Sequence, residues 1–351
     1  MTTKSVRYWL PLAACVLALL LAEGGVRVLA VATGRDRMMA VDDRLGWVLR
    51  PGVEKLQRQE QAYRVRINSR GLRDDEAAYE RSDGVKRILL LGDSFAFGFG
   101  GVEFGERFSE VLEQRRPDLE VVNTGVPSYE PVQQYLYLIE EGVRYRPDLV
   151  LLTLYVNDYR QCFQPYDHHI GRPKGYVSLE GGELRFHEPR LSWSYRLSQS
   201  SYLFGAFDSS FGLRYYWADH SPPAVSEEER PLAWRKLISK IRAESQAAGA
   251  QFAAAFFPAP VVVARTIPDL MTELAQEEGF LFEDLSPELR PGPERSDYYF
   301  KVDPHLSAAG NALVGELLDQ RIVGPLLYGE ARGETGGEVI PLEAAPKSSR
   351  R

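Results

Sequence analysis

From Lys86 onward, short apolar runs alternate with segments of helical character. Uninterrupted apolar runs are typical of strands that are buried on both faces. They lie at residues 87–91, 119–123, 148–154, 251–257 and 281–283. The segments predicted to be helical lie at residues 105–114, 131–145, 232–248, 268–278 and 307–318. This alternation predicts an α/β fold in which helices cover both faces of a parallel sheet.

Three parts of the chain depart from this pattern. Residues 35–85 form a polar lead segment with short strands, among them 63–67, which is followed by a turn at 68–71. Residues 159–226 interrupt the alternation; they begin with a hairpin around Gly181-Gly182 and continue into an aromatic-rich stretch. We expect these aromatic side chains either to form a small core of their own or to cap a functional site of the main domain. Residues 329–351 are rich in Gly, Glu, Pro and Ser and are predicted to be disordered, which leaves 86–328 as the main domain.

The N-terminal segment, residues 1–34, is predicted to be a targeting or anchoring element. An uncharged stretch runs from Tyr8 to Ala22, and Glu23 and Arg27 follow it before the apolar pattern resumes. We favour an uncleaved signal-anchor, which places the main domain outside the cytoplasm, periplasmic or at the cell surface. The alternatives are cleavage after Ala32, which would give a secreted protein, lipoprotein processing at Cys15, or a buried N-terminal helix.

The composition argues against nucleic-acid binding and against a zinc site made of cysteines. Of 351 residues, 42 are Lys or Arg and 49 are Asp or Glu, which gives a net charge of −7. An acidic chain is a poor partner for nucleic acid, which needs a basic face. The two cysteines are too few for a cysteine zinc cluster, and a disulfide between Cys15 and Cys162 is not expected. The oligomeric state stays open.

Four groups of candidate functional residues lie at the carboxyl ends of predicted elements. Ser94 follows the first strand and Gly125 the second, and Asn157 lies just past the third. Asp303 and His305 precede the last helix. In open parallel sheets, ligands bind at the carboxyl ends of the strands. A serine with a histidine and a carboxylate can perform nucleophilic catalysis, and backbone or amide N–H groups can stabilise an oxyanion.

The order Ser, Gly, Asn, His makes the sequence resemble the SGNH (GDSL-type) hydrolase family. Gly92–Phe95 matches the first block, Gly125 the second, Asn157-Asp158 the third, and Asp303 with His305 the last. The resemblance implies a flavodoxin-like three-layer α/β/α sandwich, here with an N-terminal membrane segment and an aromatic-rich insertion. It also implies a site that needs neither metal nor cofactor.

Two departures from the family pattern are visible. Tyr155 stands where the third block usually has Gly, two residues before Asn157. The last block is Asp-x-His, whereas the family usually has Asp-x-x-His. This shorter spacing resembles the branch that includes alginate O-acetyltransferases, which are anchored proteins that modify exopolysaccharides.

The resemblance implies acyl transfer through a covalent intermediate. Ser94 attacks an ester carbonyl, His305 takes the proton and later returns it, and Asp303 orients the imidazole. The oxyanion is held by the N–H groups of Ser94 and Gly125 and by the side-chain amide of Asn157.

These features predict a serine esterase that removes O-acyl groups, acetyl above all, from carbohydrate or another small ester. Two alternatives remain: an O-acetyltransferase acting on an exported polysaccharide, and a non-catalytic polysaccharide-binding protein. Asp93 and Asp158 are interpreted as loop-forming carboxylates that bond to backbone N–H groups. A metal site at His168-His169 is not expected, since adjacent residues point in different directions.

Overall fold

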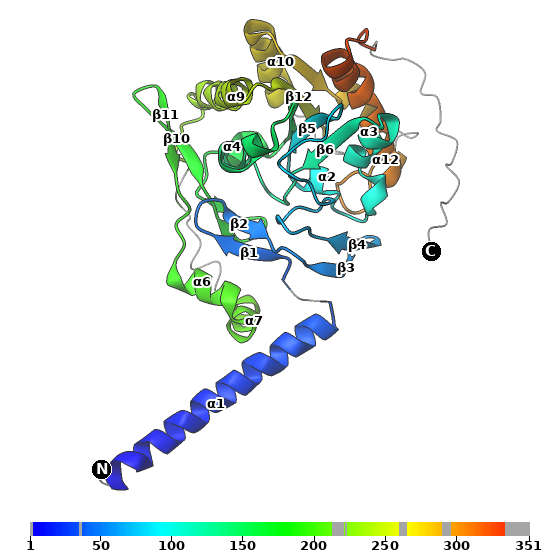
Figure 1. Ribbon diagram of the computed structural model, residues 1–351. Coiled ribbons are helices and arrows are strands. Elements are labelled where there is room, and N and C mark those ends of the chain that lie inside the picture. Colours follow the sequence, from blue (N-terminus) through cyan, green and yellow to red (C-terminus); the bar gives the residue numbers. More distant parts are fainter. Residues whose placement is uncertain are drawn as a thin grey trace, which may run out of the picture.

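The structure is a computed structural model that describes residues 3–34, 37–212, 221, 223–259, 265–289 and 296–333. A five-stranded parallel sheet lies at its centre, in the order β13-β12-β7-β5-β6 (Figure 1). Its strands are β5 (Lys86–Leu91), β6 (Leu119–Asn123), β7 (Leu149–Tyr155), β12 (Gln251–Phe257) and β13 (Leu281–Asp284). The predicted α/β fold is confirmed.

Both faces of the sheet are buried, as the uninterrupted apolar runs predict. In β5, Ile88 and Leu90 point into one hydrophobic core, and Leu89 and Leu91 point into the other. Successive side chains on a strand face opposite sides, so a strand between two helical layers must be apolar at every position.

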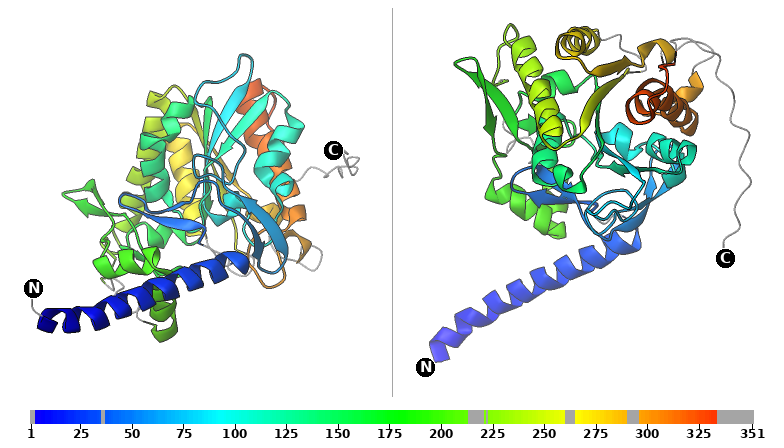
Figure 2. Two further views of the ribbon diagram at one scale, coloured as in Figure 1. Left: turned by 60° about the horizontal axis from the view of Figure 1, so that its bottom comes forward. Right: turned by 45° about the horizontal axis from the view of Figure 1, so that its top comes forward.

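Helices cover both faces and complete the three layers (Figures 1 and 2). One face packs against α4 (Pro131–Glu140), α9 (Arg230–Ala247) and α10 (Thr266–Glu278). The other packs against α3 (Phe108–Arg115), α11 (Ser286–Leu289) and α12 (Ala308–Leu318). The remaining short helices are α2 (Ser94–Phe97) and 3₁₀ turns at Phe104–Glu106, Gly142–Tyr145 and Ser296–Tyr298.

Two predicted helices are shorter than expected. The helix expected over 131–145 ends at Glu140, and the chain tightens into the 3₁₀ turn Gly142–Tyr145. Gly142 allows this turn to approach the sheet, because a Cβ there would lie 2.7 Å from Leu89 Cδ2. The helix expected over 105–114 begins at Phe108, since Arg107 is extended. Conversely, α12 continues as a π-helical stretch, Asp319–Tyr328, that the sequence pattern did not indicate.

The polar lead segment folds into two hairpins that pack on the main domain. They are β1 (Met39–Asp42) with β2 (Gly46–Leu49), and β3 (Glu54–Arg58) with β4 (Ala62–Arg66). Trp47 and Tyr63 are fully buried in a core that they share with Phe97, at the end of α2. The lead segment is therefore built into the same body as the sheet.

The insertion begins with α5 (Asp158–Gln161) and a short ladder of β8 (Tyr166–Asp167) with β9 (Arg172–Pro173). The predicted hairpin follows as β10 (Tyr176–Glu180) and β11 (Glu183–His187), with Gly181 and Gly182 both at positive φ in its turn. Next come α6 (Trp193–Ser200) and α7 (Tyr202–Phe211).

The aromatic stretch of the insertion is predicted to form its own core or a cap, and the structure shows neither arrangement for its described residues. Helix α7 packs along the N-terminal helix and α6 contacts β1, whereas α2 lies elsewhere in the body (Figure 1). Phe207 and Phe211 are exposed. The described aromatic residues therefore form neither a closed core nor a cap over Ser94, and Tyr215–Trp217 lie outside the described residues.

The N-terminal segment is one long helix, α1 (Thr3–Ala32), which extends away from the body (Figure 2). Its portion Trp9–Ala32 is long and apolar enough to cross a membrane, and only 6% of that stretch is buried. The alternative of a buried N-terminal helix is therefore wrong.

The C-terminal tail begins later than predicted. Glu330 forms an ion pair with Arg116, and Arg332 forms one with Glu283. These contacts hold the chain to the body up to this point, so disorder from Gly329 onward is wrong for these residues. The rest of the predicted tail, 334–351, lies outside the described residues.

A buried guanidinium joins the lead segment to the turn after β5. Arg73 donates to the carbonyl oxygens of Phe97 at 2.7 Å, Gly98 at 2.9 Å and Val102 at 2.7 Å. Burial and the nearby charge of Arg107 lower the pKa of Arg73 to about 10, so it stays protonated at neutral pH. The dipoles of these carbonyl groups stabilise the charge of Arg73, and the hydrogen bonds fix the path of residues 97–102.

We expect Arg73→Met to lower the free energy of unfolding by about 3–5 kcal/mol, because several buried carbonyl groups lose their donor. The matched control is Arg64→Met. The Arg64 side chain is 71% exposed and pairs with Glu54 on the surface, so its loss should cost less than about 1 kcal/mol. Urea unfolding of both variants measures the difference, and equal effects would contradict the structural role of Arg73.

Candidate active site

Ser94 is the first residue of α2, where the chain turns sharply at the end of β5. Gly92 permits this turn, because a Cβ there would lie 2.4 Å from Thr153 Oγ1 and 2.5 Å from Ala96 Cβ. Asp93 caps the helix by accepting the N–H of Phe95 at 2.8 Å. The first N–H groups of a helix have no acceptor within it, so the Ser94 N–H is not used by the hydrogen bonds of α2.

His305 lies on a tight loop between the last 3₁₀ turn and α12. Tyr299 and Leu306 form a β-bridge, and Phe300 N–H donates to the His305 carbonyl oxygen at 3.0 Å. Ser307 then caps α12 by accepting the N–H of Gly310. The loop therefore has a defined shape between two anchored ends.

The structure brings three of the predicted residues into contact. His305 Nε2 lies 2.7 Å from Ser94 Oγ, although the two residues are 211 positions apart. His305 Nδ1 contacts Asp303 Oδ1, which also accepts the His305 N–H at 3.0 Å. Burial by itself would raise the pKa of Asp303, but the hydrogen bonds and charge of His305 outweigh it and lower that pKa below its ordinary value. Asp303 is thus a carboxylate at neutral pH.

Aromatic rings surround the imidazole. The ring centroids of Phe95 and Phe99 lie 4.9 Å and 5.1 Å from that of His305. Tyr155 packs against Phe95 with a centroid separation of 4.5 Å. Burial raises the pKa of the Tyr155 hydroxyl, so it stays protonated and keeps its O–H as a hydrogen-bond donor. The imidazole is therefore held by flat apolar surfaces.

Gly125 lies beyond the end of β6, next to α2. A Cβ at this position would approach Phe97 N at 2.6 Å and Ala96 Cβ at 2.7 Å, so only Gly allows this contact. However, the Gly125 N–H already donates to Asn123 Oδ1 at 3.0 Å. In this structure the predicted oxyanion donor is engaged inside the protein.

Asn157 follows β7, the strand that pairs with β5 in the sheet. Its Oδ1 is buried and has no hydrogen-bond partner among the described residues. A side-chain amide that is not engaged by the protein can be directed to a bound molecule. Asn157 Oδ1 and Asp158 Oδ1 are therefore two buried acceptors at this edge with unused hydrogen-bonding capacity.

The interpretation of Asp93 and Asp158 as loop-forming carboxylates is confirmed. Each accepts a backbone N–H, from Phe95 and Tyr155 respectively, at 2.8 Å. Burial raises the pKa of Asp93 to about 6. Burial and the charge of Asp93 raise the pKa of Asp158 well above its ordinary value. Two carboxyl groups in one apolar environment thus favour a protonated form.

Glu60, in the turn between β3 and β4, is a site-forming residue that the sequence did not reveal. Its carboxylate accepts three consecutive backbone N–H groups, from Lys301 and Val302 at 2.7 Å and from Asp303 at 2.9 Å. These hydrogen bonds lower the pKa of Glu60. The contact spans 243 positions and carries no local signal, because one Glu in a polar stretch looks like any exposed acid.

Among the described residues, no group of three or more His, Cys, Asp or Glu side chains is arranged to hold a metal ion.

Residues 90–313, more than half of the chain, match the GDSL-like Lipase/Acylhydrolase family. The chain belongs to this family. It is accordingly a GDSL-type hydrolase that acts on ester bonds, and the predicted resemblance is confirmed at the level of the family.

Three solved structures are similar to this GDSL-type hydrolase. TesA is 15% identical, with a TM-score of 0.42, over 69% of this chain and 100% of its own. The psychrotrophic esterase EstA from Pseudoalteromonas sp. is 14% identical, with a TM-score of 0.39, over 66% and 93%. A GDSL-like lipase from Bacteroides thetaiotaomicron VPI-5482 is 12% identical, with a TM-score of 0.39, over 69% and 90%. A comparison with curated proteins finds no match.

We expect Glu60→Ala to lower kcat for hydrolysis of p-nitrophenyl acetate by roughly 10- to 100-fold, because a loop that shifts by about 1 Å misplaces the imidazole. Glu54→Ala, in the same hairpin, is the matched control, since Glu54 pairs only with the exposed Arg64 side chain in a surface ion pair. An unchanged kcat in Glu60→Ala would show that the 301–303 loop keeps its shape without this carboxylate.

We expect the stability advantage of Asp93→Asn over the wild type to grow as the pH rises through about 6. In the folded wild type the pKa of Asp93 is raised to about 6, so proton binding stabilises the folded state at low pH. That contribution is lost as the pH rises through the folded pKa. Asn does not titrate and can still accept the Phe95 N–H.

Urea unfolding of both proteins at several pH values between about 4 and 8 measures this difference. A difference that stays constant across the range would mean that Asp93 titrates at its ordinary pKa in the folded protein.

Proposed function

We propose that this GDSL-type hydrolase is a serine esterase that removes short O-acyl groups, acetyl above all, from carbohydrate. Ser94 attacks the ester carbonyl as His305 accepts its proton, and a tetrahedral intermediate forms. His305 then gives the proton to the leaving alcohol, which leaves an acyl-Ser94 ester. Water, activated by the same imidazole, hydrolyses that ester and regenerates Ser94.

The observation that carries this proposal is the alignment of Ser94, His305 and Asp303. The 2.7 Å separation of Ser94 Oγ and His305 Nε2 is hydrogen-bond distance, so the proton can transfer without rearrangement. The contact of His305 Nδ1 with Asp303 supports the tautomer in which Nε2 is free to accept. The lowered pKa of Asp303 supports a carboxylate that stabilises the imidazolium formed during the reaction.

For the oxyanion we propose the Ser94 N–H and the Asn157 amide as donors. Ser94 N–H lies at the start of α2, where the helix dipole also favours negative charge. The Gly125 N–H contributes only if it exchanges Asn123 Oδ1 for the substrate oxygen. Such an exchange is chemically reasonable because an oxyanion is a stronger acceptor than a neutral amide.

The shape of the site supports a substrate in which a short acyl group is attached to a larger molecule. The rings of Phe95 and Phe99 pack at a tilt against the imidazole, and Tyr155 packs against Phe95 behind it. Ser94 and His305 are nevertheless partly exposed, so an ester on the surface of a polymer can reach them. We also propose an extracytoplasmic location with α1 as the anchor, supported by the length and composition of that helix.

The test is acetate release from acetylated xylan and from p-nitrophenyl acetate, with the wild type compared with Ser94→Ala. We expect loss of activity on the order of 10⁶-fold, because the nucleophile is removed. Ser178→Ala is a matched control. Ser178 Oγ lies 2.7 Å from His187 Nε2 on the β10–β11 hairpin, so it reproduces the serine–histidine contact away from the proposed site.

Equal activity in the wild type and Ser94→Ala would overturn the assigned nucleophile. Activity on p-nitrophenyl acetate without acetate release from acetylated xylan would overturn the xylan ester as substrate but keep Ser94. Acetyl transfer from p-nitrophenyl acetate to added oligosaccharide, in preference to water, would identify a transferase.

A further inference from the structure

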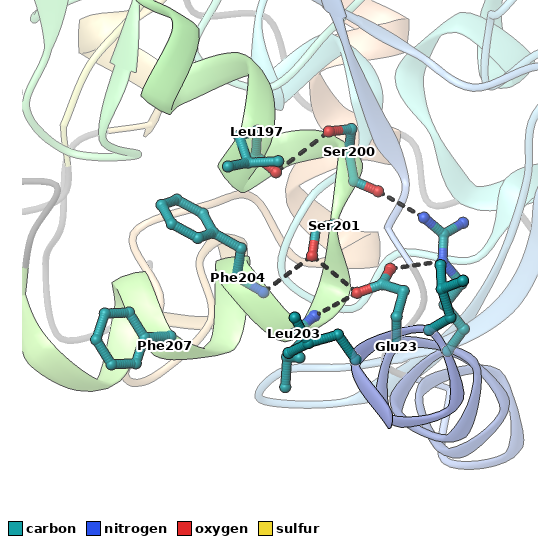
Figure 3. A pocket seen from close by; sticks show the side chains of 10 residues that line it. Glu23, Leu197, Ser200, Ser201, Leu203, Phe204 and Phe207 are labelled. Carbon is teal, nitrogen blue, oxygen red and sulfur yellow. Dashed lines mark hydrogen bonds and ion pairs between the residues drawn. The ribbon is translucent and has the colours of Figure 1, made fainter. Parts of the chain in front are cut away.

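The charged residues that interrupt α1 connect it to α7. The Glu23 carboxylate accepts the N–H group of Leu203 and the hydroxyl of Ser201, both at 2.8 Å (Figure 3). It also accepts the N–H group of Tyr202 at 2.9 Å. These two are the first N–H groups of α7, which have no acceptor within the helix. An acid on one helix therefore caps the start of the other.

Arg27 completes this junction. Its Nε lies 2.6 Å from Glu23 Oε1, and its Nη2 donates to the Ser200 carbonyl oxygen at 2.6 Å (Figure 3). The two charged residues within Trp9–Ala32 are thus partnered by each other and by the α6–α7 backbone. Ionisable residues in a membrane-spanning helix are costly and pair with one another or with backbone groups.

An apolar groove of about 760 Å³ lies beside this junction, between α1 and the α6–α7 pair. Its apolar walls, which Figure 3 shows, are formed by Leu19, Leu20, Leu197, Leu203, Phe204 and Phe207. Phe207 is 50% exposed and Phe211, one turn further along the same face of α7, is 65% exposed. The groove and this face form one continuous apolar surface with α1.

The depth of this surface follows from helix geometry. At 1.5 Å per residue, the stretch Trp9–Ala32 is about 36 Å long, enough for a hydrocarbon layer of about 30 Å. Leu19 and Leu20 lie about 15 Å along it from Trp9, well inside such a layer. Because they form one wall of the groove, the opposite wall lies at the same depth.

We propose that α7 is embedded in the bilayer beside α1, with its Phe207–Phe211 face and the groove filled by lipid acyl chains. The inference requires that α1 crosses the membrane, and it is independent of the proposed esterase activity. A helix with one apolar aromatic face can bury that face among acyl chains while its other face stays against the protein. The catalytic domain is then held at the membrane surface in a fixed orientation by two helices.

Charge supports lipid as the occupant. A second cavity, of about 1290 Å³, lies between the C-terminal half of α1, β3 and α7, and Arg37, Lys55 and Arg58 are among the residues that line it. These cations lie toward the end of α1 that adjoins the body, where lipid headgroups would lie; the Arg37 guanidinium also donates to the carbonyl oxygens of Gln199 and Ser201. Basic residues next to a membrane-spanning helix are attracted to anionic lipid headgroups.

The test measures the depth of α7 in vesicles. Full-length protein carrying Cys15→Ser is reconstituted in phosphatidylcholine vesicles and labelled with an environment-sensitive fluorophore at Phe207→Cys or Phe211→Cys. Cys162 is buried and leaves the background unlabelled. The matched control is Gln246→Cys, an exposed position on α9, across the body from α1 (Figure 1).

We expect phosphatidylcholine carrying a nitroxide on its acyl chain to remove most of the fluorescence at positions 207 and 211, while aqueous iodide leaves it unchanged. The control label should respond in the opposite way. Iodide quenching at 207 and 211 equal to that of the control would overturn the proposal. Cleavage after Ala32 would also overturn the proposal. The protein would then be recovered free of vesicles and without α1, the helix beside which α7 is proposed to be embedded.

Discussion

The hydrogen bonds of Arg73 hold together the parts of this protein that must not move. A buried guanidinium is stable only where acceptors surround it, and here the acceptors are the backbone carbonyl groups of 97–102. Arg107 in turn donates to the Arg73 carbonyl oxygen and forms an ion pair with Glu110. Displacing the lead segment would leave these cations and carbonyls unpaired in the core, so the turn that carries Ser94 keeps its shape.

The lead segment restrains both sides of the proposed site. Arg73 fixes the chain just after α2, and Glu60 fixes the backbone that carries Asp303. The serine and the histidine lie on different elements, so their separation depends on whatever joins those elements outside the sheet. The β3–β4 hairpin makes this connection, and the side chain of Tyr63 on β4 is fully buried against the body. A stretch that reads as a polar lead in the sequence is thus structurally part of the site.

The sequence predicts what is encoded locally. Apolar runs identify the strands of the central sheet, and Ser94, Asp303 and His305 are recognisable because motif spacing reflects local turns. Glu60 is not recognisable, because its partners lie more than 240 positions away and any acceptor would serve. For the oxyanion donors, the sequence identifies a residue but not the state of its N–H group. The motif selects Gly125 for its missing side chain, but only the fold shows that its N–H is already bonded to Asn123.

Carboxylates in this chain act repeatedly as acceptors for backbone N–H groups. Asp93 caps α2, Glu60 holds the 301–303 loop, and Glu23 caps α7. A charge-assisted hydrogen bond to a backbone N–H is about twice as strong as a neutral one, and it fixes main chain irrespective of the partner's side chain. The surplus of acidic residues is therefore in part a set of backbone restraints. Glu23 restrains α7 beside α1, and Glu60 restrains the loop that carries Asp303. Hydrogen bonds of the same kind therefore hold the body against α1 and shape the proposed site.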